Sequence, residues 1–340
     1  MRSLVFVGPG HMDLQDRPDP TPGAGEVVVA VRAAGICGSD VHGYLGVTGR
    51  RRPGVVMGHE AAGDVIEVGA GVTRVRPGDR VALRSILPCG ACERCRRGES
   101  NICPNRQGLG MQFDGAYADR ILLPETMLLP LPDTLSYADG ALIEPLAVAM
   151  HAVNRTPFDL MDFVVVIGAG AIGLLTLLAA RLRGAGSIVV TDRNEHRLAM
   201  AKTLGADQAV NVDVADPVAI VLDATGGRGA DAVFEAVGIG ATVAQSLATA
   251  RSGGHITWIG NSLPTVELSM QELVTRELTL RGAYTFNEEF EQAADAIAGG
   301  WIDVGRLVER TAPLDQGAEL FRQLGAAELD AVKVILVPNG

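Results

Sequence analysis

Residues 163–173, FVVVIGAGAIG, constrain the fold more than any other part of the sequence. A run of apolar, mostly β-branched residues leads into the pattern G-x-G-x-x-G at Gly168, Gly170 and Gly173, and a Leu/Ala-rich stretch follows. This order is typical of a buried strand, a glycine turn and a packed helix. The first glycine permits the turn, the second lets the backbone approach a pyrophosphate, and the third allows close helix–strand packing. We therefore predict a dinucleotide site.

A carboxylate at the end of the next expected strand supports this site. Asp192 lies nineteen residues after Gly173, where it can accept hydrogen bonds from the ribose hydroxyls of the adenosine. A carboxylate at this place repels a 2′-phosphate and favours NAD over NADP, although Arg193 follows at once and weakens that preference. The alternative is an ordinary strand–turn–helix that binds nothing.

The pattern of expected secondary structure changes near residue 155. Beyond it, expected strands at 163–167, 187–191, 231–235 and 255–259 alternate with expected helices at 171–182, 195–204 and 241–250, which predicts parallel βαβ units. Before residue 147, short strands lie between Gly/Pro turns, most clearly at 27–34, 61–68 and 80–83. After a strand at 279–282 we expect helices at 288–298 and 315–324 and a last strand at 332–337. The 340 residues suit about two domains.

Composition excludes several classes of protein. The net charge of −11, with no basic run beyond residues 50–52, argues against nucleic acid as a partner. We expect that run to be a solvated loop, and the alternative is that it contributes near the substrate entrance. Residues 163–180 carry no charge, but their glycines indicate a buried strand and helix, not a membrane span. The N-terminal apolar stretch ends too early for a secretory signal, so we expect a cytoplasmic protein without a disulfide framework.

Four of the five cysteines fall within fifteen residues. Cys89, Cys92, Cys95 and Cys103 form the string CGACERCRRGESNIC, which can wrap one tetrahedral Zn²⁺ with four thiolates. Because four thiolates leave no open position, such a zinc is structural. The alternatives are an iron–sulfur cluster or a redox C-x-x-C, and the redox motif lacks a βαβ setting here.

The fifth cysteine lies in a different chemical setting. Cys37 begins CGSDVH, which also places a hydroxyl, a carboxylate and an imidazole within six residues, at Ser39, Asp40 and His42. Further along, His59-Glu60 and Glu144 offer additional ligands. Cysteine, histidine and carboxylate with a free fourth position indicate a catalytic zinc. The alternative is that His59 and Glu60 form a surface pair and Glu144 merely begins a helix.

Together, CGSDVH, the run GHEAAGDVIEVGAGV at 58–72, the cysteine quartet and ALIEPLAVAMHA at 141–152 resemble the zinc-dependent medium-chain alcohol dehydrogenases, in particular their sorbitol (polyol)/threonine dehydrogenase branch. The resemblance covers almost the whole chain and implies an α/β plus β fold. A GroES-like catalytic domain would comprise residues 1–150 and 285–340, with the structural zinc lobe at 85–105. A Rossmann domain, a doubly wound parallel sheet, would occupy 151–284. The resemblance also implies a homodimer or homotetramer.

The resemblance assigns roles around the catalytic zinc. Cys37, His59 and Glu60 match its ligands, and Glu144 matches the glutamate that holds the zinc-bound water or replaces it. Which of the two glutamates is the direct ligand stays open. Ser39 and His42 match a proton relay, and Asp40 matches the carboxylate that orients His59.

It also assigns residues to the nucleotide. Ile172, Asp192 and Arg197 match residues that contact NAD. Four further positions fall near the nicotinamide and pyrophosphate contacts, namely Ile259, Gly260, Ala283 and Tyr284.

The two cysteine motifs predict two zinc ions per chain, and the resemblance implies a hydride transfer to NAD from a secondary hydroxyl of a small polyol or sugar alcohol, giving the ketone. The alternative within enzymes is an L-threonine or other amino-alcohol 3-dehydrogenase. Outside enzymes, the alternative is a non-catalytic dinucleotide-binding sensor or structural relative.

Overall fold

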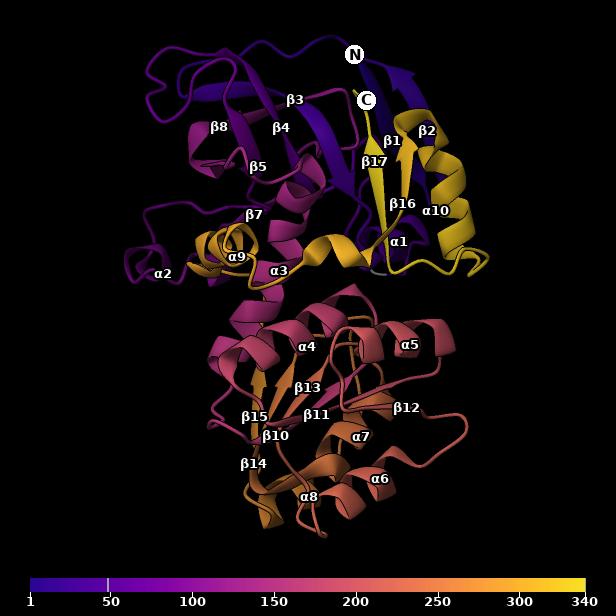
Figure 1. Ribbon diagram of the computed structural model, residues 1–340. Helices are drawn as coiled ribbons and strands as arrows, with labels where there is room; N and C mark the ends of the chain where they lie inside the picture. Colours follow the sequence, from indigo (N-terminus) through magenta and orange to yellow (C-terminus); the bar gives the residue numbers. More distant parts are fainter. Residues whose placement is uncertain (48, 340) are drawn as a thin grey trace. The chain divides into compact units, whose positions relative to one another are not determined.

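Two separate β-sheets organise the chain in the computed structural model, which describes residues 1–47 and 49–339 (Figure 1). One sheet belongs to a compact unit made of Met1–Glu144 and the C-terminal segment that begins at Phe290. The other belongs to a unit made of Pro145–Glu289. The boundaries of the functional domains expected at residues 150 and 285 stay a prediction.

The sheet of the first unit joins strands from both ends of the chain. Its strand order is β16-β17-β3-β4-β5-β9, and β8 also pairs with β3. Figure 1 shows the yellow C-terminal strand β17 beside the indigo strand β3. The strands are β3 (Glu26–Gly35), β4 (Glu60–Val68), β5 (Arg80–Leu83), β8 (Arg120–Pro124), β9 (Leu128–Pro130), β16 (Val308–Pro313) and β17 (Lys333–Val337).

Short elements surround this sheet. A hairpin at the N-terminus and a small two-stranded sheet next to the cysteine lobe complete the strands: β1 (Arg2–Gly8) with β2 (His11–Asp16), and β6 (Ile86–Leu87) with β7 (Gln107–Gly108). The α-helices are α1 (Gly38–Tyr44), α2 (Glu93–Arg96), the first part of α3 (Tyr137–Arg155), α9 (Glu289–Ala298) and α10 (Gly317–Gly325). Short 3₁₀ turns are η1 (Ser100–Ile102), η2 (Glu125–Met127), η3 (Val304–Leu307) and η4 (Leu314–Gln316).

The sheet of the second unit is parallel throughout its described strands. Its order is β12-β11-β10-β13-β14-β15, which is the 3-2-1-4-5-6 order of a doubly wound dinucleotide-binding sheet. The central strand β10 has Val164, Val165 and Val166 fully buried, as its uninterrupted apolar sequence requires. The strands are β10 (Phe163–Ile167), β11 (Ser187–Asp192), β12 (Gln208–Asn211), β13 (Ala230–Glu235), β14 (Ala250–Trp258) and β15 (Thr279–Gly282).

Helices cover both faces of this sheet. Figure 1 places α4 and α5 on one face and α6 and α7 on the other, as right-handed crossovers on the two sides of β10 require. The helices are α4 (Ala171–Arg183), α5 (Glu195–Thr203), α6 (Pro217–Ala224), α7 (Gly240–Thr249) and α8 (Met270–Thr275). Among the described residues, no helix is long and apolar enough to span a membrane.

The expected alternation after residue 155 is confirmed, and the expected helix bounds differ from the observed ones by one or two residues. Several short elements were not predicted: the hairpin β1–β2, the strands β8, β9, β12 and β16, and the helices α6 and α8. Most of them are too short for a clear periodicity of apolar and polar residues.

Candidate functional site

The end of β3 and the start of β4 bring three predicted ligands together. Cys37 follows β3, His59 precedes β4 and Glu60 is the first residue of β4, and β3 and β4 are antiparallel neighbours with Gly35 opposite Glu60. One ligand atom from each of the three residues lies within 4.8 Å of those of the other two. A thiolate, an imidazole and a carboxylate are a donor set that suits zinc with one position left open.

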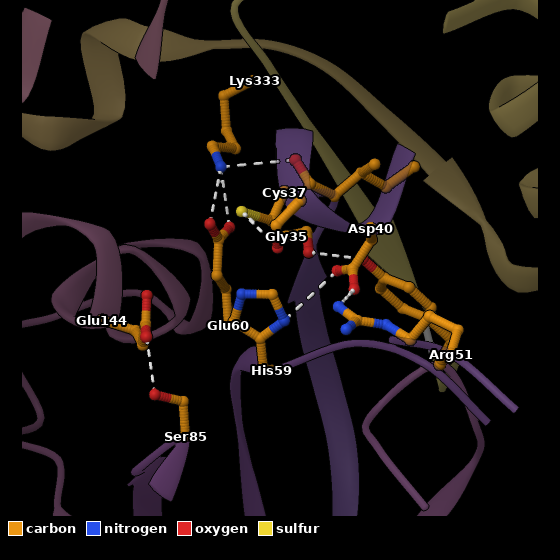
Figure 2. A network of polar contacts seen from close by, with 12 residues as sticks. Gly35, Cys37, Asp40, Arg51, His59, Glu60, Ser85, Glu144 and Lys333 are labelled. Atoms are coloured by element: carbon orange, nitrogen blue, oxygen red, sulfur yellow. Dashed lines mark hydrogen bonds and ion pairs between the residues drawn. The ribbon is translucent and has the colours of Figure 1, made fainter. Parts of the chain in front are cut away.

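Asp40 lies beside this cluster and is fully buried. His59 Nδ1 lies 3.3 Å from Asp40 Oδ2, so Nε2 is the nitrogen left for a metal (Figure 2). Burial alone opposes the charged imidazole, but Asp40 and Cys37 raise the pKa of His59 well above its ordinary value. The structure therefore places Asp40 where the predicted orientation of His59 requires it.

Asp40 has two further partners that sequence reasoning missed. Arg51 Nη2 donates to Asp40 Oδ1 over 2.7 Å, and the Tyr117 hydroxyl donates to Asp40 Oδ2 over 2.8 Å. Burial alone raises the pKa of Asp40, but His59 and Arg51 lower it well below its ordinary value. The expectation of a solvated loop is thus wrong for Arg51, whose side chain is only 3% exposed, because it neutralises a buried carboxylate.

A second buried cation reaches the cluster from the C-terminal strand. Lys333 Nζ lies 2.7 Å from Glu60 Oε2 and 3.0 Å from Oε1, and it also donates to the carbonyl of Ile36 (Figure 2). Burial alone lowers the pKa of Lys333, but Glu60 and Cys37 raise it above its ordinary value. Sequence reasoning missed Lys333, although a lone lysine at the start of the apolar strand KVILV is a signal that could have found it.

Glu144 lies apart from the three ligand atoms. It does not belong to the cluster of Cys37, His59 and Glu60, and its Oε1 accepts a 2.6 Å hydrogen bond from Ser85. Burial raises the pKa of Glu144 to about 7. Of the two glutamates that the sequence left open as ligands, Glu60 therefore lies among the ligand atoms and Glu144 faces Ser85 (Figure 2).

The two predicted relay residues lie on α1. Ser39 is exposed and donates to Cys37 Sγ over 3.4 Å, which puts its hydroxyl next to the cluster. His42 lies three residues further along the helix, on the same side, and is half-buried. Burial lowers the pKa of His42, so its imidazole is neutral at pH 7 and can accept a proton.

The cysteine quartet has the dimensions of a zinc site. A tetrahedral zinc with bonds of about 2.3 Å holds its sulfurs about 3.8 Å apart. The Sγ–Sγ distances are 3.5 Å for Cys92–Cys95, 3.7 Å for Cys92–Cys103 and 4.0 Å for Cys89–Cys95. All four thiols are free, so disulfides do not explain the cluster. Backbone hydrogen bonds lower the pKa of Cys89 to about 6, whereas burial and the neighbouring thiols raise the pKa of Cys95 to about 12.

The predicted nucleotide residues meet at one edge of the parallel sheet, because each follows or ends a strand at its carboxyl end. The glycine turn has the required shape: Gly168 has a φ of +99°, and a Cβ on Gly173 would lie 1.7 Å from the Gly168 carbonyl oxygen. A Cβ on Gly170 would meet no protein atom within 4 Å. This open backbone is the surface that a pyrophosphate needs.

Asp192 and Arg193 are held in defined positions at this edge. Asp192 accepts hydrogen bonds from the backbone N–H groups of Ala169, Arg193 and Asn194, which ties its carboxylate to the glycine turn. The Arg193 guanidinium pairs with Asp213 over 2.9 Å. This pairing partly satisfies the guanidinium that could otherwise receive a 2′-phosphate.

The other predicted contacts of the nucleotide lie at the same edge. Ile172 is on the first turn of α4 and Arg197 on the first turn of α5. The N–H groups of Ile259 and Gly260 both donate to the carbonyl oxygen of Glu235, while Ala283 and Tyr284 follow β15.

Glu235 itself was missed. It is fully buried, and its Oε1 accepts from the backbone N–H groups of Val237 and Gly238, so it shapes the turn after β13. A charged residue that ends the apolar strand ADAVFE is the signal that could have found it.

Known proteins share both halves of this arrangement. Residues 23–133 match the alcohol dehydrogenase GroES-like domain, and residues 171–299 match the zinc-binding dehydrogenase family. The chain is 32% identical to the sorbitol dehydrogenase of Bacillus subtilis (strain 168) over 100% of its length and 98% of the relative. It is 34% identical to the D-arabitol-phosphate dehydrogenase of Enterococcus avium, over 100% and 98% of the two chains.

A solved structure agrees with these relatives. A zinc-binding dehydrogenase of Sinorhizobium meliloti 1021 bound to NADP superimposes with a TM-score of 0.92 and 31% identity, over 99% of each chain. The chain belongs to the zinc-type medium-chain alcohol dehydrogenases. It is an oxidoreductase with a GroES-like and a Rossmann domain, and its chemistry depends on zinc and a nicotinamide dinucleotide.

Proposed function

We propose that this enzyme oxidises a secondary hydroxyl of a small polyol or sugar alcohol to the ketone and transfers the hydride to NAD. The observation that carries this proposal is the cluster of Cys37, His59 and Glu60, which brings together the thiolate, imidazole and carboxylate donors of a catalytic zinc. Its relatives include dehydrogenases named for sorbitol and for D-arabitol phosphate. A threonine dehydrogenase is not favoured.

Cys37, His59 and Glu60 would hold the metal, and Asp40 would keep His59 in the orientation that directs Nε2 to it. When bound, zinc lowers the pKa of a ligated hydroxyl and NAD accepts the hydride. Arg51 and Tyr117 anchor Asp40, so the imidazole has one preferred direction. The quartet Cys89, Cys92, Cys95 and Cys103 would hold a second, structural zinc.

The proton released from the substrate would leave along α1. Ser39, whose hydroxyl lies next to Cys37 Sγ, would pass it on, and the neutral His42 would accept it and release it to solvent. Glu144 would hold a proton or a water through its second carboxylate oxygen, since Ser85 occupies the first.

We propose NAD rather than NADP as the preferred nucleotide. The Asp192 carboxylate would accept from the ribose hydroxyls and repel a 2′-phosphate, while Asp213 draws the Arg193 guanidinium into an ion pair. Ile172, Arg197, Ile259, Gly260, Ala283 and Tyr284 would contact other parts of the dinucleotide.

We also propose a cytoplasmic homodimer or homotetramer with neither nucleic acid nor membrane as a partner. Five cysteines without a disulfide, four of them in one possible metal cluster, are typical of a protein of the reducing cytosol. The net charge of −11 disfavours a polyanionic partner.

The test is the rate of NAD reduction with a panel of substrates, before and after treatment with a chelator. The panel contains sorbitol, D-arabitol, D-arabitol phosphate, 2,3-butanediol and L-threonine. We expect kcat/KM to be highest for a polyol or its phosphate, and the chelator to remove the activity. A higher kcat/KM for L-threonine, or activity that survives loss of the exchangeable zinc, would overturn the proposal.

A further inference from the structure

Lys333 is unusual for its residue type and for its burial. The chain has 27 arginines and only two lysines, at 202 and 333. Lys202 is exposed, whereas the side chain of Lys333 is 2% exposed and that of its partner Glu60 is 1% exposed. The Lys333 ammonium contacts Glu60 Oε1 and Oε2 and the Ile36 carbonyl, so its three N–H donors have three acceptors.

The sheet brings these two charges together across β3. Gly35 pairs with Ile335 of β17 on one side and with Glu60 of β4 on the other. A Cβ on Gly35 would lie 2.2 Å from Glu60 Oε2, so the absence of a side chain there makes room for the carboxylate. The contact to the Ile36 carbonyl attaches Lys333 to the backbone one residue before Cys37.

The position of the ammonium limits how Glu60 can bind a cation. Nζ is almost equally distant from the two carboxylate oxygens, at 2.7 and 3.0 Å, so it occupies the side where a chelating cation would lie. The lone pairs that remain on Glu60 allow binding through one oxygen.

We propose that Lys333 is a positioning residue that restricts Glu60 to a weak, one-oxygen contact with the catalytic metal. Glu60 then remains exchangeable, which keeps a coordination position available to the substrate hydroxyl. This inference rests on the proposed metal role of Cys37, His59 and Glu60. A purely structural ion pair would stabilise the fold without weakening the binding of the metal, and this difference is measurable.

The test is the Zn²⁺ affinity of Lys333→Met, measured on the full chain by competition with a chromogenic chelator. Lys202→Met is the matched control, because it removes the exposed lysine. For the more weakly held of the two zinc ions, we expect affinity to rise about tenfold in Lys333→Met and to stay unchanged in Lys202→Met. Unchanged or weaker binding in Lys333→Met would overturn the proposal. Should this variant not fold, Lys333→Gln replaces it with the same expectation.

A double variant tests whether Glu60 carries the effect. In the background of Glu60→Gln, which cannot chelate as a carboxylate, Lys333→Met should alter zinc affinity by less than about threefold. If Lys333→Met raised the zinc affinity equally in the wild type and in Glu60→Gln, the effect would be simple charge repulsion, and the role of Glu60 would be overturned. With Co²⁺ in place of zinc, we expect the visible spectrum to change in Lys333→Met and not in Lys202→Met.

These readouts require no substrate, so they separate the two proposals. If zinc binds more tightly in Lys333→Met but no polyol is oxidised by the wild type, the proposed substrate class fails and the role of Lys333 stands. If polyols are oxidised but the affinity does not change, the role of Lys333 fails and the proposed function stands.

Discussion

Replacing Arg51 by Met should destabilise the folded unit that contains it far more than the loss of a solvent-exposed arginine would. The Arg51 side chain is 3% exposed and its partner Asp40 is fully buried, so the substitution leaves a buried carboxylate without its cation. Breaking a buried pair by removing one partner costs about 3–5 kcal/mol. Asp40 keeps Tyr117 and His59 as partners, so we expect the loss to lie at the low end, about 3 kcal/mol.

The assay is urea unfolding of the zinc-loaded protein, followed by circular dichroism. Arg52→Met is the matched control, because Arg52 is the exposed neighbour of Arg51, and we expect it to change the free energy of unfolding by less than about 0.5 kcal/mol. We also expect Arg51→Met to weaken zinc binding, since Asp40 orients His59. If Arg51→Met and Arg52→Met unfold within about 1 kcal/mol of each other, the assignment of Arg51 to a buried ion pair is refuted.

Three further predictions concern the second unit. Burial alone raises the pKa of Asp231, but hydrogen bonds from Arg228, the backbone and Arg251 lower it below its ordinary value. The ionised Asp231 therefore stabilises the folded state fully above about pH 4, and this stabilisation is lost as the pH falls further. Asp231→Asn should therefore flatten the fall of the urea midpoint between about pH 5 and pH 3, and an unchanged slope would contradict this. Gly170→Ala should leave the melting temperature unchanged, because its Cβ meets no protein atom, but should weaken NADH binding about tenfold in a fluorescence titration. Equal binding would show that the nucleotide does not approach this backbone. Asp192→Ser should raise the ratio of kcat/KM for NADP to that for NAD about tenfold in initial-rate assays, and an unchanged ratio would remove Asp192 from nucleotide selection.

The sequence by itself determined the features that depend on neighbouring residues. The strand, glycine turn and helix at 163–173 are confirmed as β10 and α4, because burial of an apolar strand and the needs of a tight turn act over a few residues. The cluster of four cysteines could also be predicted from the sequence, since the short spacing of the thiols almost defines it. The family resemblance extended this reading to Cys37, His59 and Glu60, which the structure brings together.

Only the tertiary structure decided which charges neutralise those ligands. Lys333 reaches Glu60 across 273 residues of sequence, through the pairing of β17 with β3 and of β3 with β4. The same folding turned Arg51 from an expected surface residue into the partner of Asp40, and it separated Glu144 from the ligand atoms. The physical reason is that a buried charge must find a counter-charge, and strand register and packing determine which one lies within reach.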